Sequence, residues 1–125
     1  MRKEKDSMGE MYVPDDAYYG AQTQRAIDNF QISNFKLSKS MIDALAIIKR
    51  SAAIANHQLG LIDKNIKDAI ISSADEIIDG KFDNQFLIDI FQTGSGTSSN
   101  MNCNEIISNR ASEILGGTIG TKKPV

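Results

Sequence analysis

The sequence is poor in metal-ligating and disulfide-forming side chains. Its 125 residues include one cysteine, Cys103, and one histidine, His57. A single cysteine cannot form an internal disulfide, so a reducing, cytoplasmic setting is the simplest expectation. A zinc site usually needs three or four such ligands, and no metal site is therefore expected.

Long apolar runs and an excess of basic charge are also missing. No stretch approaches the roughly 18 apolar residues of a membrane span, and no apolar segment follows the charged N-terminus as it would in a signal peptide. The net charge is −2, and no stripe of lysine and arginine runs along the chain. We therefore expect neither a membrane nor a nucleic-acid partner. The length suits one domain with one modest core.

Capping signals and apolar spacing predict a mainly α fold. Residues 1–20 look irregular or β-like, and Met8 to Val13 could form a short strand. A short helix is expected over residues 21–29, followed by a connector to residue 37. Ser38 is a good N-cap for a long helix that Gly60 ends. Its apolar stripe is expected to comprise Met41, Leu45, Ile48, Ala52, Ala55 and Leu59.

Two further helices are predicted after Gly60. Asp63 can cap the first, which Gly80 ends, with apolar positions at Ile66, Ile70, Ser73 and Ile77. The short loop before this helix predicts that it is antiparallel to the preceding one. The other helix begins near Ser98 and runs to Leu115, with an apolar face of Cys103, Ile107, Ala111 and Ile114. Residues 118–125 carry no core signal.

The segment Thr93-Gly94-Ser95-Gly96-Thr97 has the composition of an anion-binding loop. Its two glycines let the backbone approach a ligand closely, and its hydroxyls can donate hydrogen bonds. The helix that follows offers free N–H groups and the positive end of its dipole. A carboxylate and a phosphate fit this pattern equally well.

Other interpretations of this segment exist. A flexible loop with a Ser/Thr helix cap explains the pattern alone just as well. A dinucleotide-binding fingerprint does not fit, because Ser99 stands where its third glycine would be and no βαβ unit surrounds it. A phosphate-binding loop does not fit either, because no Gly-Lys-Ser/Thr follows.

Three asparagines alternate at the predicted start of the next helix, at Asn100, Asn102 and Asn104. Asparagine is a poor helix former. Asn100 and Asn104 would share one face, since they are four residues apart. We expect these amides to support the loop through hydrogen bonds to its backbone rather than to act in catalysis, although ordinary capping is the simpler alternative.

The run from Thr93 to Glu105 closely resembles the corresponding segment of class II fumarases, in the fumarase/aspartase superfamily. Further matches in the same order are Lys5-Asp6-Ser7-Met8-Gly9-Glu10, Tyr19 to Arg25, Asp75-Glu76 with Gly80-Lys81, and Asn109 to Glu113. The resemblance covers the whole chain. It implies the N-terminal helical domain of that fold over residues 1–125.

The resemblance implies a reaction and a site. The reaction is the reversible addition of water to fumarate, giving (S)-malate, a step of the tricarboxylic acid cycle, with no metal or organic cofactor. Ser95 and Thr97 would bind the dicarboxylate with the Gly96 backbone between them, and Thr93 would shape the loop. These donors would stabilise an aci-carboxylate intermediate as an oxyanion hole does.

The resemblance also implies that most of the enzyme lies elsewhere. Family members are much longer than this chain, and they continue into a His-Pro-Asn-Asp segment. Their catalytic residues and the helical bundle that forms the homotetramer follow later, so residues 1–125 would contain no catalytic residue and would be inactive alone.

Two alternatives to a fumarase remain. Aspartases also resemble the chain, and Ser98 is familiar from them, but they typically carry Gly and Ala where Thr93 and Ser95 stand. An aspartase-like ammonia lyase is therefore the first alternative. A stand-alone helical module that binds a partner through the stripe from Met41 to Leu59 is the second.

Other titratable residues are expected to be structural. His57 is interpreted as a surface or partly buried helical histidine, and Cys103 as a buried thiol. Asp75, Glu76 and Asp79 are placed on a solvated helix face. Arg25 is expected to pack against a domain outside this chain.

Overall fold

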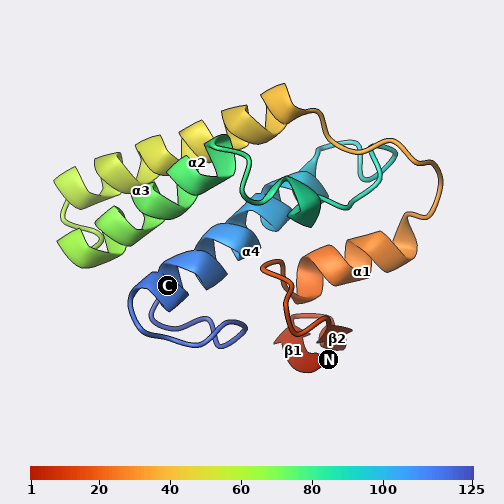
Figure 1. Ribbon diagram of the computed structural model, residues 1–125, viewed down its shortest axis with the longest axis horizontal. Coiled ribbons are helices and arrows are strands. Elements are labelled where there is room, and N and C mark those ends of the chain that lie inside the picture. The colour runs from red at the N-terminus through yellow and green to blue at the C-terminus, as the bar shows by residue number, and fades with distance from the viewer.

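The chain folds into a β-hairpin followed by four α-helices (Figure 1). The computed structural model describes residues 1–125. The mainly α fold is confirmed. Its elements are β1 (Arg2–Asp6), β2 (Gly9–Val13), α1 (Ala21–Asn29), α2 (Lys39–Gln58), α3 (Lys64–Ile78), a short 3₁₀ turn η1 (Asp83–Gln85) and α4 (Thr97–Ile114).

The N-terminal hairpin was only half expected. β1 and β2 pair antiparallel, with Arg2 opposite Val13 and Asp6 opposite Gly9. The first strand has no alternation of apolar and polar residues, so its sequence does not predict a strand. Contacts outside the hairpin hold it instead: the Arg2 guanidinium donates to the carbonyls of Pro14 at 2.9 Å and Tyr19 at 2.8 Å.

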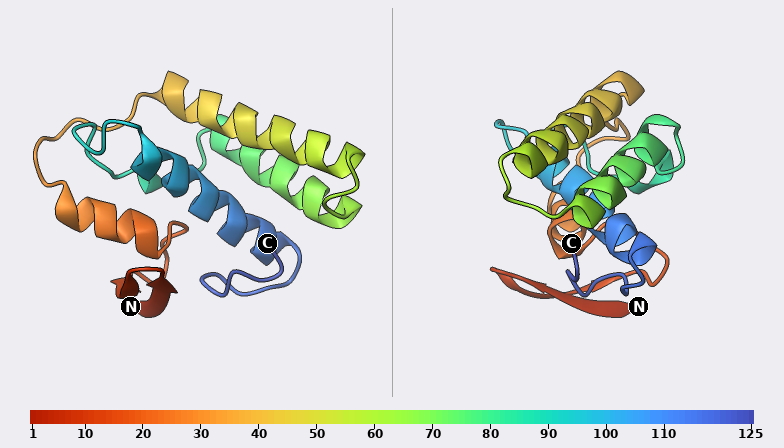
Figure 2. Two further views of the ribbon diagram at one scale, coloured as in Figure 1. Left: turned by 180° about the vertical axis from the view of Figure 1, so that it is seen from behind. Right: turned by 90° about the vertical axis from the view of Figure 1, so that its left-hand side faces the viewer.

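Helices α2 and α3 lie side by side and antiparallel, as expected (Figures 1 and 2). The Ser38 hydroxyl accepts a hydrogen bond from the Met41 N–H, and Gly60 has a φ of +75° just after α2, so both end signals of α2 are confirmed. Asp63 occupies the N-cap position of α3, but its side chain makes no capping hydrogen bond. The Lys39 ammonium ties the helix ends together by donating to the Ile77 carbonyl at 3.0 Å.

The predicted apolar stripe of α2 is mostly wrong as a buried face, because only Leu45 of its six residues packs against the core. The buried residues of this helix are Ile42, Ala46 and Ala53, whereas Met41 is 52% exposed, Ile48 59% and Leu59 72%. α2 carries apolar side chains around much of its circumference, so more than one row has helical spacing. The small alanines face the core because they let neighbouring helices approach closely.

Helix α4 runs through the middle of the domain and contacts α1, α2 and α3 (Figure 2). Cys103, Ile107 and Ala111 are buried on it as expected, but Ile114 is 41% exposed. The core also takes in Ile106 and the hairpin residue Val13. No helix of the domain combines the length and apolarity needed to cross a membrane.

The final residues fold back along α4, although their sequence carries no core signal. The Gly120 N–H donates to the Asn109 side-chain oxygen at 2.8 Å. Ser108 Oγ donates to the Val125 carbonyl at 2.6 Å, and the Val125 N–H donates to Ser112 Oγ at 3.2 Å. Buried and half-buried polar side chains of α4 therefore hold the backbone of the last segment.

Candidate functional site

The glycine-rich loop lies at the exposed end of the domain where α4 begins (Figure 1). The Gly96 N–H donates to the Thr93 carbonyl at 3.1 Å, which closes a tight turn. Gly96 is the N-cap of α4, with a left-handed φ of +76° that favours glycine. The hydroxyls of Ser95 and Thr97 lie 2.9 Å apart and share a hydrogen bond. The turn thus brings the two hydroxyls to the start of the helix.

The first two N–H groups of α4 have no hydrogen-bond partner within the protein. Gly96 has no side chain to cap them, and neither the Thr97 nor the Ser98 N–H has an acceptor within the protein. The next N–H along, that of Ser99, donates to Gln92 Oε1 at 2.9 Å. The two free donors and the positive end of the helix dipole favour an anion here.

Asp89 holds the segment that leads into the glycine-rich loop. Its buried carboxylate accepts hydrogen bonds from the Ser33 N–H, from Ser33 Oγ at 2.9 Å and from the Phe91 N–H at 2.8 Å. Burial alone would raise the pKa of Asp89, but the hydrogen bonds from Phe91 and Ser33 outweigh it, and the pKa lies below its ordinary value. An ionised Asp89 thus joins the loop to the connector before α2.

The three asparagines do not hold the loop backbone as expected. Asn100 accepts a 2.5 Å hydrogen bond from the Lys49 ammonium. Asn102 is buried and donates to the Gln85 carbonyl in η1 at 3.1 Å. Asn104 lies close to the Met101 sulfur. On a helix, these side chains point to different neighbours, so each bonds whatever element packs at its own position.

A cavity of about 250 Å³ lies between the loop, α1 and the hairpin. Thr93 and Ser98 line one side of it, and Arg25 and Asn29 line another. The Arg25 guanidinium pairs with Asp6 at 2.8 Å. Arg25 therefore has an ion-pair partner within this chain, and its packing against a domain outside the chain stays a prediction.

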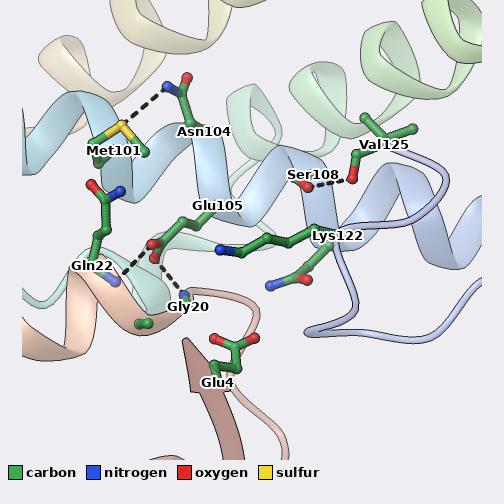
Figure 3. A pocket seen from close by; sticks show the side chains of 11 residues that line it. Glu4, Gly20, Gln22, Met101, Asn104, Glu105, Ser108, Lys122 and Val125 are labelled. Carbon is green, nitrogen blue, oxygen red and sulfur yellow. Dashed lines mark hydrogen bonds between the residues drawn. The ribbon is translucent and has the colours of Figure 1, made fainter. Parts of the chain in front are cut away.

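Glu105 is the last residue of the segment from Thr93 to Glu105, but its side chain caps α1 and does not contact the glycine-rich loop. Its carboxylate accepts hydrogen bonds from the N–H groups of Gly20 and Gln22 at the start of α1 (Figure 3). It also accepts one from the Thr23 N–H. A cavity of about 260 Å³ lies beside it, lined also by Glu4 and Lys122. Burial raises the pKa of the Glu4 carboxyl. Sequence reasoning missed the Glu105 cap because its partners lie more than eighty residues earlier.

The remaining titratable residues have structural partners. His57 Nδ1 lies 2.9 Å from the Ile62 carbonyl just beyond α2, and Cys103 is buried, which raises the pKa of its thiol to about 11. Both predictions are confirmed. Glu76 was wrongly placed on a solvated face: its side chain is 19% exposed and pairs with Arg110 at 2.7 Å. No group of three or more His, Cys, Asp or Glu side chains lies close enough together to hold a metal ion.

Comparisons with known proteins cover nearly the whole chain. A family model described as "Lyase" matches residues 9–125. The fumarate hydratase class II of Halobacterium salinarum is 58% identical over 121 residues, which are 97% of this chain and 26% of that protein. An aspartate ammonia-lyase from Bacillus sp. is 50% identical over 116 residues, which are 93% of this chain and 25% of that protein.

The fold has close counterparts among solved structures. A fumarate lyase:delta crystallin from Brucella melitensis superposes with a TM-score of 0.96 at 46% sequence identity, and the match covers 100% of this chain and 29% of that one. The chain thus spans about a quarter of the length of the curated relatives it matches.

Proposed function

This chain belongs to the lyase family, and from that membership we propose that residues 1–125 form the N-terminal domain of a class II fumarate hydratase. The complete enzyme would catalyse the reversible hydration of fumarate to (S)-malate. The 58% identity to a fumarate hydratase class II over nearly the whole chain supports this assignment.

The contribution of this domain would be a carboxylate-binding loop formed by Ser95, Gly96 and Thr97. The single observation that carries the proposal is the set of unpartnered donors at the start of α4, the N–H groups of Thr97 and Ser98, beside two exposed hydroxyls. Fumarate and malate carry carboxylates at both ends, and one of these could accept from several donors at once.

The same donors would assist the chemistry. Removal of a proton next to a carboxylate concentrates negative charge on the carboxylate oxygens. Donors already held in place stabilise that charge without having to reorganise. Thr93 would shape the turn through its carbonyl, which accepts from the Gly96 N–H. The proton-transferring residues would come from beyond residues 1–125, and neither a metal nor an organic cofactor would be required.

The loop assignment can be tested on the 125-residue chain by NMR titration with fumarate. We expect saturable shifts of the Thr97 and Ser98 amide signals, and we expect Ser95→Ala and Thr97→Val each to weaken binding about fivefold to tenfold. Ser72→Ala and Thr118→Val are matched controls, since both residues are exposed and their hydroxyls make no hydrogen bond within the protein. Shifts that spread over the surface without saturating would contradict the assignment.

The absence of catalysis by this domain alone is tested separately. The purified chain should not convert fumarate to malate at a measurable rate. Turnover near that of an intact hydratase would show that residues 1–125 contain the proton-transferring groups, which would contradict this part of the proposal.

An aspartase-like ammonia lyase is the second candidate, favoured by the 50% identity to an aspartate ammonia-lyase. Thr93 and Ser95 favour the hydratase, because aspartases typically carry Gly and Ala there. Supplying the full-length gene product with fumarate in water, and with fumarate plus ammonia, separates the two. Malate formation supports the hydratase, and aspartate formation supports the ammonia lyase.

The assembly and setting of the enzyme complete the proposal. We infer that the complete enzyme is a homotetramer, as the family resemblance implies, and that it lies in the cytoplasm. The exposed apolar row of α2, which includes Met41, Ile48 and Leu59, is compatible with further protein surface packing on this domain.

A further inference from the structure

Gln92 connects the two ends of the glycine-rich loop. Its side-chain oxygen accepts from the Ser99 N–H at 2.9 Å and from Ser99 Oγ at 3.2 Å. Its side-chain nitrogen donates to the Asp89 carbonyl at 3.0 Å. We propose that Gln92 is a positioning residue for the dicarboxylate site, holding the start of α4 so that the Thr97 and Ser98 N–H groups stay free for the ligand. This inference rests on the proposed function.

The need for such a residue follows from the N-cap of α4. A Ser, Thr, Asp or Asn at the N-cap position of a helix accepts from the second or third N–H group through its side chain. Gly96 occupies that position and has no side chain. Gln92 supplies the missing acceptor from four residues upstream, and it satisfies the third N–H of the helix, that of Ser99. The first two remain available.

The neutrality of the amide matters as much as its position. A Glu side chain at this place would accept from the same Ser99 N–H, but its negative charge would lie in the positive field of the helix end. It would then compete with an anionic ligand for that field. Because the Gln92 amide is neutral, it caps the helix without competing with an anionic ligand for the positive end of the helix dipole.

The other end of the Gln92 side chain fixes it to a rigid base. The Asp89 carbonyl accepts its amide hydrogen bond, while the Asp89 carboxylate is buried and bonded to Ser33 and Phe91. The loop from Thr93 to Ser98 is therefore closed by side-chain bonds at both ends. Its hydroxyls and free N–H groups are held before a ligand arrives, which lowers the entropy lost on binding.

Two variants separate positioning from charge. Gln92→Ala removes all three side-chain hydrogen bonds, so we expect the Ser99 amide to exchange with solvent about tenfold faster and fumarate binding to weaken about fivefold. Gln92→Glu loses the amide donor to the Asp89 carbonyl but keeps an acceptor for Ser99. Ser99 exchange should therefore stay within about twofold of wild type, while the added charge should weaken fumarate binding about tenfold. Gln31→Ala and Gln31→Glu are the matched controls, because Gln31 makes the same kind of bond, to the Asp28 carbonyl at 3.0 Å.

Ligand charge provides a readout that a loss of stability would not change. Affinities for fumarate, with two carboxylates, and for its monoamide, with one, are measured by NMR titration of each variant of the 125-residue chain. Gln92→Glu should lower the fumarate affinity more than the monoamide affinity, whereas Gln92→Ala should lower both by a similar factor.

The possible results are distinct. Unchanged Ser99 exchange and unchanged fumarate affinity in Gln92→Ala would overturn the role of Gln92 alone, as would equal losses in the Gln31 variants. If the wild-type chain gives no saturable response to fumarate, the proposed dicarboxylate site is wrong. The proposal that the Thr97 and Ser98 N–H groups bind the ligand is then wrong as well. Faster Ser99 exchange with weakened fumarate binding, both confined to the Gln92 variants, supports the inference.

Discussion

The carboxylate of Glu105 accepts a 2.6 Å hydrogen bond from the backbone N–H of Gly20, 85 residues earlier in the chain. It accepts two more, from Gln22 at 2.8 Å and from Thr23 at 3.2 Å. Gly20 is the N-cap of α1 and has no side chain with which to cap it. A residue in the middle of α4 thus caps α1, and its negative charge lies where the dipole of α1 favours one.

Removing this cap should destabilise the domain. Glu105→Ala leaves three N–H groups of α1 without their acceptor, so we expect a loss of about 2 kcal/mol in the free energy of unfolding. Glu105→Gln should cost about 1 kcal/mol, since an acceptor remains but the charge is lost. Urea denaturation measures both. The control is Glu10→Ala, which breaks an exposed ion pair with Lys3 and should cost less than about 0.5 kcal/mol; an equal cost for Glu105→Ala would contradict the prediction.

The two loop glycines should respond differently to alanine. Gly96 has a φ of +76°, which costs an alanine about 1 kcal/mol. Gly94 has no such dihedral angle, and a Cβ there meets nothing within 4 Å. Gly96→Ala should therefore lower the unfolding free energy by about 1 kcal/mol and weaken fumarate binding, while Gly94→Ala should leave stability within about 0.5 kcal/mol of wild type. Thermal unfolding compares the pair, and equal effects of the two would count against this account.

The ion pair between Glu76 and Arg110 predicts a loss of stability in acid. Two hydrogen bonds from the guanidinium, at 2.7 and 3.0 Å, hold the pKa of Glu76 below its ordinary value. The pKa of Glu76 is lower in the folded state than its ordinary value of about 4.5. The ion pair therefore stabilises the fold fully above about pH 4.5, and this stabilisation is lost as the pH falls through the pKa of Glu76 in the folded state.

Glu76→Gln tests this dependence. We expect it to cost about 1 to 2 kcal/mol at pH 7 and to flatten the fall in stability below about pH 5. Asp75→Asn is the control, since Asp75 pairs with Arg50 at 2.9 Å with a side chain that is 49% exposed, and its loss should cost less than about 0.5 kcal/mol. Denaturation in urea at a series of pH values gives both curves. A Glu76→Gln curve parallel to wild type would refute the assignment.

Removing the hydroxyl of Thr23 should not destabilise the domain and could stabilise it. Its side chain is fully buried, and its Oγ1 has no hydrogen-bond partner. Valine has nearly the same shape and no polar atom to desolvate. Thr23→Val should therefore leave stability unchanged or raise it by about 1 kcal/mol. A clear loss of stability by calorimetry would indicate a partner for this hydroxyl.

Much of the helical layout follows from signals within a few residues. The sequence predicted a helix over residues 21–29, which is α1, and it predicted the Ser38 cap and the ends of α2 and α3. Caps and left-handed glycines act through hydrogen bonds and dihedral angles of adjacent residues, so they can be recognised locally. The hairpin strand Arg2–Asp6 was missed because its residues are mainly charged and long-range contacts hold it.

The buried face of α2 could not be read from spacing. Met41 and Ile42 belong to rows with equally helical spacing, and only the packing of α3 and α4 buries Ile42 and exposes Met41. The same limit applies to Glu105, because only the tertiary structure places the start of α1 beside it.

By itself, the sequence determined that the chain is mainly α, where most of its helices end, and that a hydroxyl-rich glycine turn precedes α4. These properties depend on the dihedral angles and hydrogen bonds of residues adjacent in the chain. The tertiary structure alone decided that Gln92 engages Ser99, that Glu105 caps α1, and that the Thr97 and Ser98 N–H groups remain free. Those outcomes depend on which side chains meet after packing, because a polar group bonds to the partner that the fold brings within reach.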